Sequence, residues 1–456
     1  MLLKPTVWRH LHFESNAQPL VISPIFDARQ MWRGLQQTLG TVKFPNMTLA
    51  SFSVLAVLPV LLYRGGDSYA ELRKHGAETA RSLARLTALK GCDNVVRPVE
   101  QVAALDGATL SAAMGNAGNN HQNPHGDSIA SAKESRDDTA FLPRSKSDDW
   151  ARTVGAALPA DASEAAVKAH ARANFGNIGV PPFSLPLANI WCGPFHVCLR
   201  VFLTLWKRIC AHAARTGKLV TLQSVVSAVV RRKVTLTTVS RSGQHVINIK
   251  GNLMKRILAS RNLFAEAAKK GVFSERAAET LQWLLDTLDL KRRLMWTTDQ
   301  LLFDTHWASF ARIALTWMRV AKAVLGDYMV VPTLRREVDR VPLYMHRCYK
   351  EFRTTYGAFT EEPSEALHLR HKRHAKKLTA QGSHSHCSTS LPDKFFAVDC
   401  RWRQTERHRE RHADDGAACH VRPRQRERAP AAGSRRQEAR AQSSEARSAR
   451  PCRLRC

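Results

Sequence analysis

The sequence lacks several signatures that would fix a function at once. It has no Gly-rich phosphate loop between a strand and a helix, which argues against P-loop and dinucleotide-binding proteins. It has no Gly-x-Ser-x-Gly elbow, which argues against a serine hydrolase of that type. Its ten cysteines include no Cys-x-x-Cys pair. We therefore expect a reducing compartment rather than a small disulfide scaffold.

Long apolar runs are also scarce. The best candidate, residues 47–63, has 17 residues and contains Pro59, whereas a membrane-spanning helix needs about 20 clean apolar residues. We expect two buried strands broken near Pro59 and no membrane partner. Residues 1–18 are polar and do not resemble a secretory signal, which favours an intracellular location.

What the sequence has in excess is positive charge. The formal net charge is +30 and the pI is about 10.3, and such a chain attracts polyanions, nucleic acid first. Residues 401–456 hold 16 Arg, no Lys and 7 acids. This composition is typical either of a functional basic tail or of GC-rich DNA translated out of frame. We expect residues 379–456 to be a disordered Arg-rich tail.

The hydrophobic pattern predicts an α/β fold. Residues 1–105 are rich in short β-branched or apolar runs bounded by Gly, Pro or Asn, which indicates strands. A helix follows Gly65-Gly66, with Asp67 or Ser68 as its cap. Residues 106–150 are rich in Gly, Asn, Ser and His and are expected to be a disordered or loop insert.

The second half of the chain has helical periodicity. Residues 151–340 are expected to form a mostly helical region with one hairpin at 234–249, turning at Ser242-Gly243. Residues 341–378 are expected to supply a helix that completes the strand-rich core. The Trp and Phe residues of 299–326 recur at helical spacing, which favours core packing over a stacking role.

Acids at predicted element boundaries are the first candidates for chemistry. Asp27 ends an apolar strand, Asp67 follows another and opens a helix, and Glu365 begins a helix behind Pro363. Carboxylates delivered from strand ends and a helix start can share a pair of divalent ions, as phosphoryl transfer requires. Such acids are also common as plain caps, so spacing alone leaves both readings open.

The helix after Pro363 is strongly basic. It predicts either contact with phosphates or a solvated surface. His368, His371 and His374 recur every three residues, which does not match a His-Glu-x-x-His zinc pattern. The basic residues of this helix are Arg370, Lys372, Arg373, Lys376 and Lys377.

Three stretches, residues 184–209, 247–296 and 340–377, resemble one family in their order and spacing. They are similar to the C-terminal half of RNase H-like DDE transposases of the Transib type, which include the catalytic subunit of V(D)J recombination, and to orphan transposon-derived proteins. The resemblance implies an RNase H-like sheet of short strands with a large, mostly helical insert. It also implies DNA as the partner, a nuclear location and a possible homodimer, with no small-molecule substrate.

The resemblance assigns site residues one by one. Glu365 matches the third catalytic acid, and Glu362 matches the acid three positions earlier. Asp67 is the nearest match to the second acid, although the expected position falls two residues away, at Gly65. Asp27 resembles the first acid. If the protein is active, these three acids, Asp27, Asp67 and Glu365, would be both catalytic and metal-binding, with Mg²⁺ or Mn²⁺ as cofactor.

Two further matches concern DNA and zinc. Gly251-Asn252 resembles the start of the helical insert of the family, and the basic residues that follow, Lys255 and Arg256, are predicted to bind nucleic acid. Of the zinc ligands of the family, His346 matches one, but Glu351 stands at the second position and the Cys pair is missing. A zinc site of that kind is therefore not expected.

Three hypotheses follow. The first is a transposase-derived DNA-binding protein with metal-dependent strand cleavage and transfer, in which water or a 3′-hydroxyl attacks a phosphodiester in line. The second is a catalytically inactive remnant or another nucleic-acid-binding protein without enzymatic activity. The third is a helical protein–protein interaction scaffold.

Overall fold

A computed structural model describes residues 11, 13–32, 35–46, 57–118, 120–136, 146–159, 161–239, 245–297, 305–367 and 369. They belong to one compact unit, residues 1–392. The fold is mixed α/β, as the hydrophobic pattern predicts.

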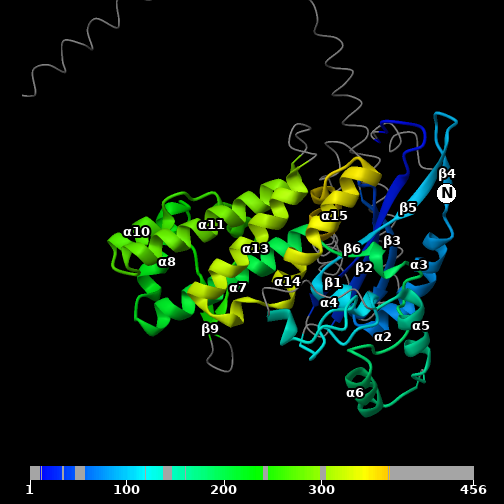
Figure 1. The fold of residues 1–456 in the computed structure, drawn as a ribbon, viewed down its shortest axis with the longest axis horizontal. Coiled ribbons are helices and arrows are strands. Elements are labelled where there is room, and N and C mark those ends of the chain that lie inside the picture. The colour runs from blue at the N-terminus through cyan, green and yellow to red at the C-terminus, as the bar shows by residue number, and fades with distance from the viewer. Residues whose placement is uncertain are drawn as a thin grey trace, which may run out of the picture. The chain divides into compact units, whose positions relative to one another are not determined.

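The sheet is built from five strands with both parallel and antiparallel pairs. The strands are β1 (Leu20–Trp32), β2 (Leu35–Lys43), β3 (Val57–Arg64), β4 (Ala88–Lys90) and β5 (Val96–Gln101). Their order is β3-β2-β1-β5-β4, and only the β1–β5 pair is parallel. Figure 1 shows β1, β2, β3 and β5 lying side by side. Neighbouring residues of β1 face opposite sides: Leu20 and Ile22 pack into a small core with Leu89, whereas Val21 joins the main core.

The sequence predicts two strands separated near Pro59. This is wrong for the residues that the structure describes, because Pro59 lies within a single strand. β3 is one strand from Val57 to Arg64 and includes Pro59, which pairs with Thr41 of β2 beside a β-bulge or other irregularity in the register. Because β3 lies at the edge of the sheet, Pro59 can lack an N–H without costing a bond to a further strand. Residues 47–56 lie outside the described residues. None of the helices that the structure describes is long and apolar enough to cross a membrane.

A helical segment and a second parallel pair follow β3. The segment consists of α2 (Tyr69–Glu71), a π-helical turn η3 (Leu72–Gly76) and α3 (Ala77–Ala84), and Ser68 caps its start as predicted. β6 (Ala103–Leu105) continues the line of β5 and pairs in parallel with β7 (Ile190–Cys192). The chain therefore has two parallel crossovers, from β1 to β5 and from β6 to β7.

The segment 106–150 agrees in part with the predicted disordered or loop insert, because the described residues of 114–133 lie in turns and loops, but it also contains helical elements. It contains α4 (Gly107–Ala113), η4 (Glu134–Arg136) and the start of α5 (Asp148–Ala156), and residues 137–145 lie outside the described part. Polar residues of this segment are held by cations of the helical region. Arg340 contacts Asp127 at 2.5 Å, and Arg336 donates to the carbonyl oxygen of Pro124 at 3.0 Å. Composition alone did not reveal these long-range partners.

The region 151–340 is mostly helical, with short strands and a hairpin. Its elements are α6 (Glu164–Ala173), η5 (Leu187–Asn189), α7 (Pro194–Arg215), α8 (Leu219–Val229), β8 (Thr237–Val239), β9 (His245–Ile247), α9 (Gly251–Leu258), α10 (Leu263–Lys269), α11 (Glu275–Trp296), α13 (His306–Leu325), η6 (Asp327–Met329) and α14 (Pro332–Asp339). In Figure 1, α7, α8, α10, α11 and α13 lie together as a bundle. The predicted hairpin is present as β8 and β9, and its turn lies outside the described residues.

The segment 341–378 is not a single helix. It forms α15 (Val341–Arg347), a π-helical turn η7 (Cys348–Phe352), η8 (Tyr356–Phe359) and a helical stretch at residues 362–367. The aromatic residues of this segment pack around the fully buried Trp191 of β7, including Tyr344 at 4.7 Å and Phe359 at 5.1 Å between ring centroids. This packing fixes the segment that carries Glu365 against the end of the parallel pair.

Candidate functional site: a carboxylate cluster

The cluster begins with Asp27 and Asp106, at corresponding positions of two parallel strands. β1 and β5 pair in parallel, with Ile22 opposite Gln101. Asp27 lies five residues after Ile22, and Asp106 lies five residues after Gln101, directly after β6. Because the strands run in the same direction, both carboxylates emerge at the same edge of the sheet. Asp106 was not predicted from the sequence.

Thr109 of α4 joins Asp106 to Asp67. Its backbone N–H donates to Asp106 Oδ1 at 2.9 Å, which caps α4, and its hydroxyl donates to Asp67 Oδ2. Burial raises the pKa of Asp67, and the negative charges of Asp106 and Asp27 raise it further, against the effect of the Thr109 hydrogen bond. Asp67 therefore lies within electrostatic range of both Asp106 and Asp27. The prediction that Asp27 ends a strand is wrong, because β1 continues past it to Trp32, where its pairing with β2 also continues.

Glu361 and Glu365 belong to the same cluster and meet at His196. Its Nδ1 lies 3.1 Å from Glu361 Oε1, and its Nε2 lies 3.2 Å from Glu365 Oε1. Burial opposes a charged imidazole, but Glu361, Glu365 and Asp106 hold the pKa of His196 well above its usual value. With both ring nitrogens donating, His196 is a cation between two carboxylates.

A glycine allows Glu361 to approach the start of α7. Gly193 precedes α7, and a Cβ atom at this position would lie 1.1 Å from Glu361 Oε1. Burial raises the pKa of Glu361, and the charge of His196 lowers it in part. Within the described part of the chain, Glu361 Oε2 has no hydrogen-bond partner. The carboxylate is thus held in a tight, partly unsatisfied position, which a larger residue at Gly193 would not permit.

Two contacts fix the Glu361–Glu365 segment on β2. Thr41 and Ser364 hydroxyls lie 2.7 Å apart, and Lys43 Nζ donates to the carbonyl oxygen of Thr360 at 3.0 Å. Burial lowers the pKa of Lys43 to about 7, although Glu361 and Glu362 favour its charged form. Lys43 is therefore a second candidate cation beside the acids, and its charge changes near neutral pH.

Basic residues border the cluster. Lys255 of α9 contacts Glu362 at 2.5 Å, and Arg256 beside it is exposed. On the other side, Asp67 and Arg200 of α7 line a pocket of about 710 Å³. A phosphodiester chain needs such cations around any group that acts on it, because its charge dominates binding.

The acids are of the type that holds Mg²⁺, but their present arrangement does not form a metal site. Among the residues that the structure describes, no three Asp, Glu, His or Cys side chains gather closely enough to hold an ion. Glu361 and Glu365 instead direct oxygen atoms at the cationic His196. The residues as arranged therefore do not fit a divalent ion, and no reaction step through one is derived.

The predicted residues are placed as follows. Burial, and then the charges of Asp106 and Asp27, raise the pKa of Asp67, and Glu361, Glu365 and Asp106 raise the pKa of His196 against the effect of burial, so Asp106 is the acid common to both groups. Glu362, matched to an acid of the family, pairs with Lys255, while its neighbour Glu361 takes the buried position. The predicted DNA-contacting residues of the last helix, Arg370, Lys372, Arg373, Lys376 and Lys377, lie outside the described residues.

The residues matched to the zinc site of the family have other contacts. His346 packs against Trp307, with ring centroids 4.7 Å apart, and Glu351 pairs with Arg347 at 2.5 Å. Both contacts are local to the helical region. The structure thus gives each of them a packing or surface role.

Sequence reasoning missed Asp106, His196 and Glu361. Asp106 had a usable signal, because an apolar run, Val102 to Leu105, precedes it and a Thr follows three positions later, as at a strand end that caps a helix. His196 had none, since its partners lie 165 and 169 positions away along the chain. Neither a scan against models of known protein families nor a search of curated proteins finds a match for this chain.

Proposed function

We propose that this protein binds DNA, as a transposase derivative with an RNase H-like core. The observation that carries the proposal is the ion pair between Lys255 and Glu362. It brings α9, the helix predicted to contact nucleic acid, against the segment that carries Glu365. Cations of the helical insert therefore border the acids of the sheet, the arrangement that a phosphodiester substrate requires.

The topology supports the RNase H-like assignment. Acids are delivered from the end of one strand, β6, from within β1 at the same edge, and from the segment after η8 that closes the fold. The long helical insert lies between them in the sequence. This is the order that the resemblance implies, with Asp106 as a closer structural match for the second acid than Asp67, because its strand runs parallel to β1.

The DNA-binding protein could be catalytically active or inactive, and a different observation favours each alternative. The convergence of five acids favours metal-dependent strand cleavage. The position of His196 favours a catalytically inactive remnant, since its ring occupies the oxygen atoms of Glu361 and Glu365 that a metal ion would need. We propose the inactive form as the state that this structure represents.

DNA binding is tested by fluorescence anisotropy with a labelled duplex over a range of salt concentrations. We expect affinity to fall steeply with salt, and each lost phosphate contact to reduce the log–log slope by about 0.9. The double variant Lys255→Gln/Arg256→Gln should weaken binding and flatten this slope. Lys270→Gln removes an exposed charge of the neighbouring α10 end and is the matched control. Salt-independent binding, or equal losses in both variants, contradicts the proposal.

Cleavage is tested with supercoiled plasmid in Mg²⁺ or Mn²⁺. For the inactive form we expect no nicking above background in the unmodified protein. Nicking that disappears in both Glu365→Gln and Asp106→Asn would instead establish the catalytic alternative. Nicking that persists unchanged in these variants would mean that the carboxylate cluster does not catalyse it.

A further inference from the structure

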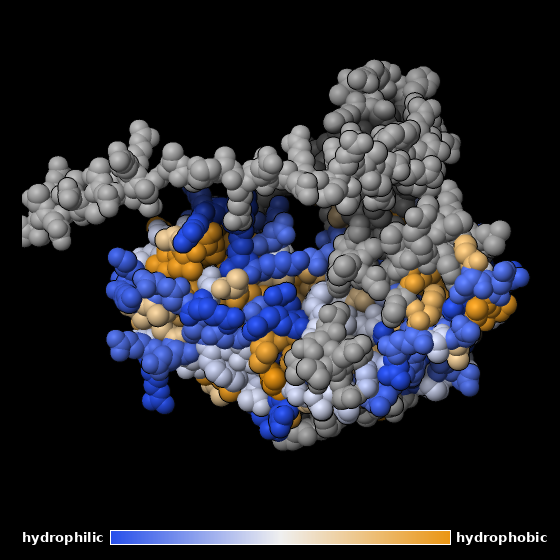
Figure 2. Space-filling view, turned by 90° about the horizontal axis from the view of Figure 1, so that it is seen from above, coloured by the Kyte–Doolittle hydropathy of each residue, from blue (hydrophilic) through white to orange (hydrophobic). Residues whose placement is uncertain are grey.

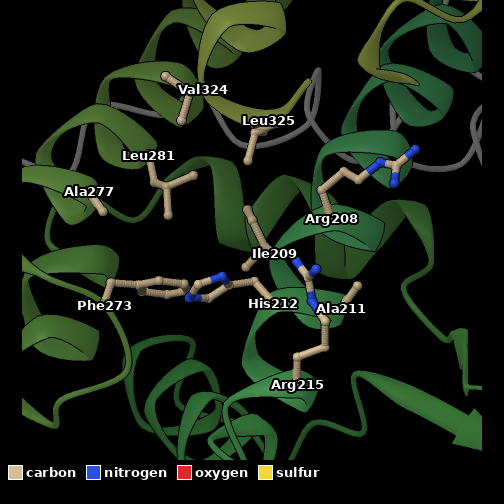
Figure 3. Close-up of a pocket in the computed structure, with 10 residues that line it drawn as sticks. All are labelled: Arg208, Ile209, Ala211, His212, Arg215, Phe273, Ala277, Leu281, Val324 and Leu325. Atoms are coloured by element: carbon tan, nitrogen blue, oxygen red, sulfur yellow. The ribbon is translucent and has the colours of Figure 1, made fainter. Parts of the chain in front are cut away.

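A second cavity lies in the helical region, away from the carboxylate cluster. Its volume is about 570 Å³, within the usual range for small-molecule sites. It is lined by Arg208, Ile209, Ala211, His212, Arg215, Phe273, Ala277, Leu281, Val324 and Leu325 (Figure 3). None of these residues belongs to the carboxylate cluster. Since α7 rises 1.5 Å per residue, His212 and His196 are about 24 Å apart along the helix.

The cavity has an apolar floor formed by three helices. Ile209 comes from α7, Leu281 from α11 and Leu325 from α13. Ile209 and Leu281 are buried, whereas Val324 at the mouth is 47% exposed. A ligand that covered Val324 and the floor would gain hydrophobic stabilisation in proportion to the apolar area removed from water.

All charged groups that line the cavity are cationic or can become so. Arg208, His212 and Arg215 occupy one face of α7, because they are spaced three or four positions apart. The His212 ring stacks on Phe273, with centroids 5.6 Å apart and planes 25° apart, and forms a flat aromatic wall (Figure 3). No acid is among the lining residues. An anion is therefore favoured over a cation or a neutral molecule.

From this combination we infer that the cavity binds a small amphiphilic anion, with an apolar or aromatic body and one carboxylate, sulfonate or phosphate group. The body lies on Ile209 and Leu281 and against the Phe273 wall. The anionic group lies at the mouth, toward Arg208 and Arg215.

The probe is 8-anilinonaphthalene-1-sulfonate, an aromatic sulfonate whose fluorescence rises in apolar surroundings. We expect saturable binding by the full-length protein. Decanoate should displace the probe, whereas decylamine, which has the same body and the opposite charge, should not. Equal displacement by both competitors would overturn the inference. Displacement by a single-stranded oligonucleotide but not by decanoate would also overturn it, because the cavity would then belong to a nucleic-acid surface.

Three variants separate the cavity from unspecific binding. Arg208→Gln/Arg215→Gln should raise the Kd for the probe about tenfold, the usual effect of losing charge-assisted contacts. Lys207→Gln removes an exposed charge of the same helix that does not line the cavity, and it should leave the Kd within about twofold. Ala277→Phe fills the cavity without changing its charge and should abolish displaceable binding. Unchanged affinity in Ala277→Phe, with unchanged circular dichroism, contradicts the inference.

Discussion

Two regions of this protein bury charge in opposite ways. In the helical region, Lys291 of α11 and Glu337 of α14 are both 0% exposed and lie 2.6 Å apart, so one cation balances one anion. The carboxylate cluster instead brings five acids together with two cationic partners, His196, whose pKa is raised, and Lys43, whose pKa burial lowers to about 7. Its acids are Asp27, Asp67, Asp106, Glu361 and Glu365.

The difference separates a structural arrangement from a candidate site. A balanced pair stabilises the packing of its two helices relative to an unpaired charge. Burial, with a smaller contribution from neighbouring acids, raises the pKa of Asp67 and Glu361, and therefore makes the folded state less stable when they are ionised. Folding does not require that excess, and such departures are typical of functional sites. On the surface shown in Figure 2, hydrophilic and hydrophobic residues are mixed, and they do not mark a site by themselves.

Breaking the balanced pair should have the largest effect on stability. Lys291→Met leaves Glu337 buried without its cation and removes the contact of Lys291 with the Trp317 ring. We expect the free energy of unfolding to fall by about 3–5 kcal/mol, measured by urea denaturation at pH 7. In the double variant Lys291→Met/Glu337→Met most of this loss should be recovered, because no charge remains buried. If the double variant is as unstable as the single one, the loss of stability comes from altered packing and not from an unbalanced buried charge.

The second prediction compares two aspartates whose pKa values shift in opposite directions. Burial opposes ionisation of Asp127, but Arg340 and Arg336 hold its pKa below the usual value, whereas the pKa of Asp67 is raised. At pH 7, Asp127→Asn should destabilise the fold by about 1–3 kcal/mol, because Arg340 loses a charged partner. Asp67→Asn should stabilise it by about 0.2–1 kcal/mol, since it removes a buried charge and its repulsion by Asp106 and Asp27 and keeps an acceptor for Thr109.

The pH dependence distinguishes the two aspartates further. The contribution of Asp127 is present above its unfolded pKa of about 3.8 and is lost as the pH falls through its lower folded pKa. For Asp67 the sign is reversed, because its folded pKa lies above 3.8, so stability is lost as the pH rises through that window. The difference in unfolding free energy between the protein and each Asn variant, measured from pH 2 to pH 7, should increase with pH for Asp127→Asn and decrease with pH for Asp67→Asn. Two slopes of the same sign would contradict the contrast.

Local patterns predicted much of the fold, and long-range contacts account for the rest. The strands around Ile22 and Thr41, the cap at Ser68 and the helices after Pro194 follow from periodicity and capping residues. The β1–β5 register does not, because it depends on which strand pairs with β1 across about 80 residues. Asp106 was therefore assigned to a loop, although its strand-end position puts it opposite Asp27.

The candidate site follows the same rule. Asp67 and Glu365 could be named because each stands near the local boundary of a strand or helix, and Asp27 because it follows a short apolar run, although the strand continues past it to Trp32. His196 could not, since it was one polar residue near the start of a long apolar helix, and only the folded chain brings it to Glu361 and Glu365. Residue type and position predict which groups can do chemistry. The identity of their partners depends on tertiary structure.

The smallest effect on stability, and the sharpest test of the comparison, concerns Lys255. Its ion pair with Glu362 lies at the surface, with side chains 42% and 31% exposed. Lys255→Gln should therefore change the free energy of unfolding by less than about 1 kcal/mol, while DNA affinity falls measurably at low salt because a phosphate-contacting cation is lost. Glu362→Gln should leave stability equally unchanged and should raise affinity, since it releases Lys255 from its acid. If both variants lower DNA affinity, the ion pair positions α9, and Lys255 does not itself contact the phosphates.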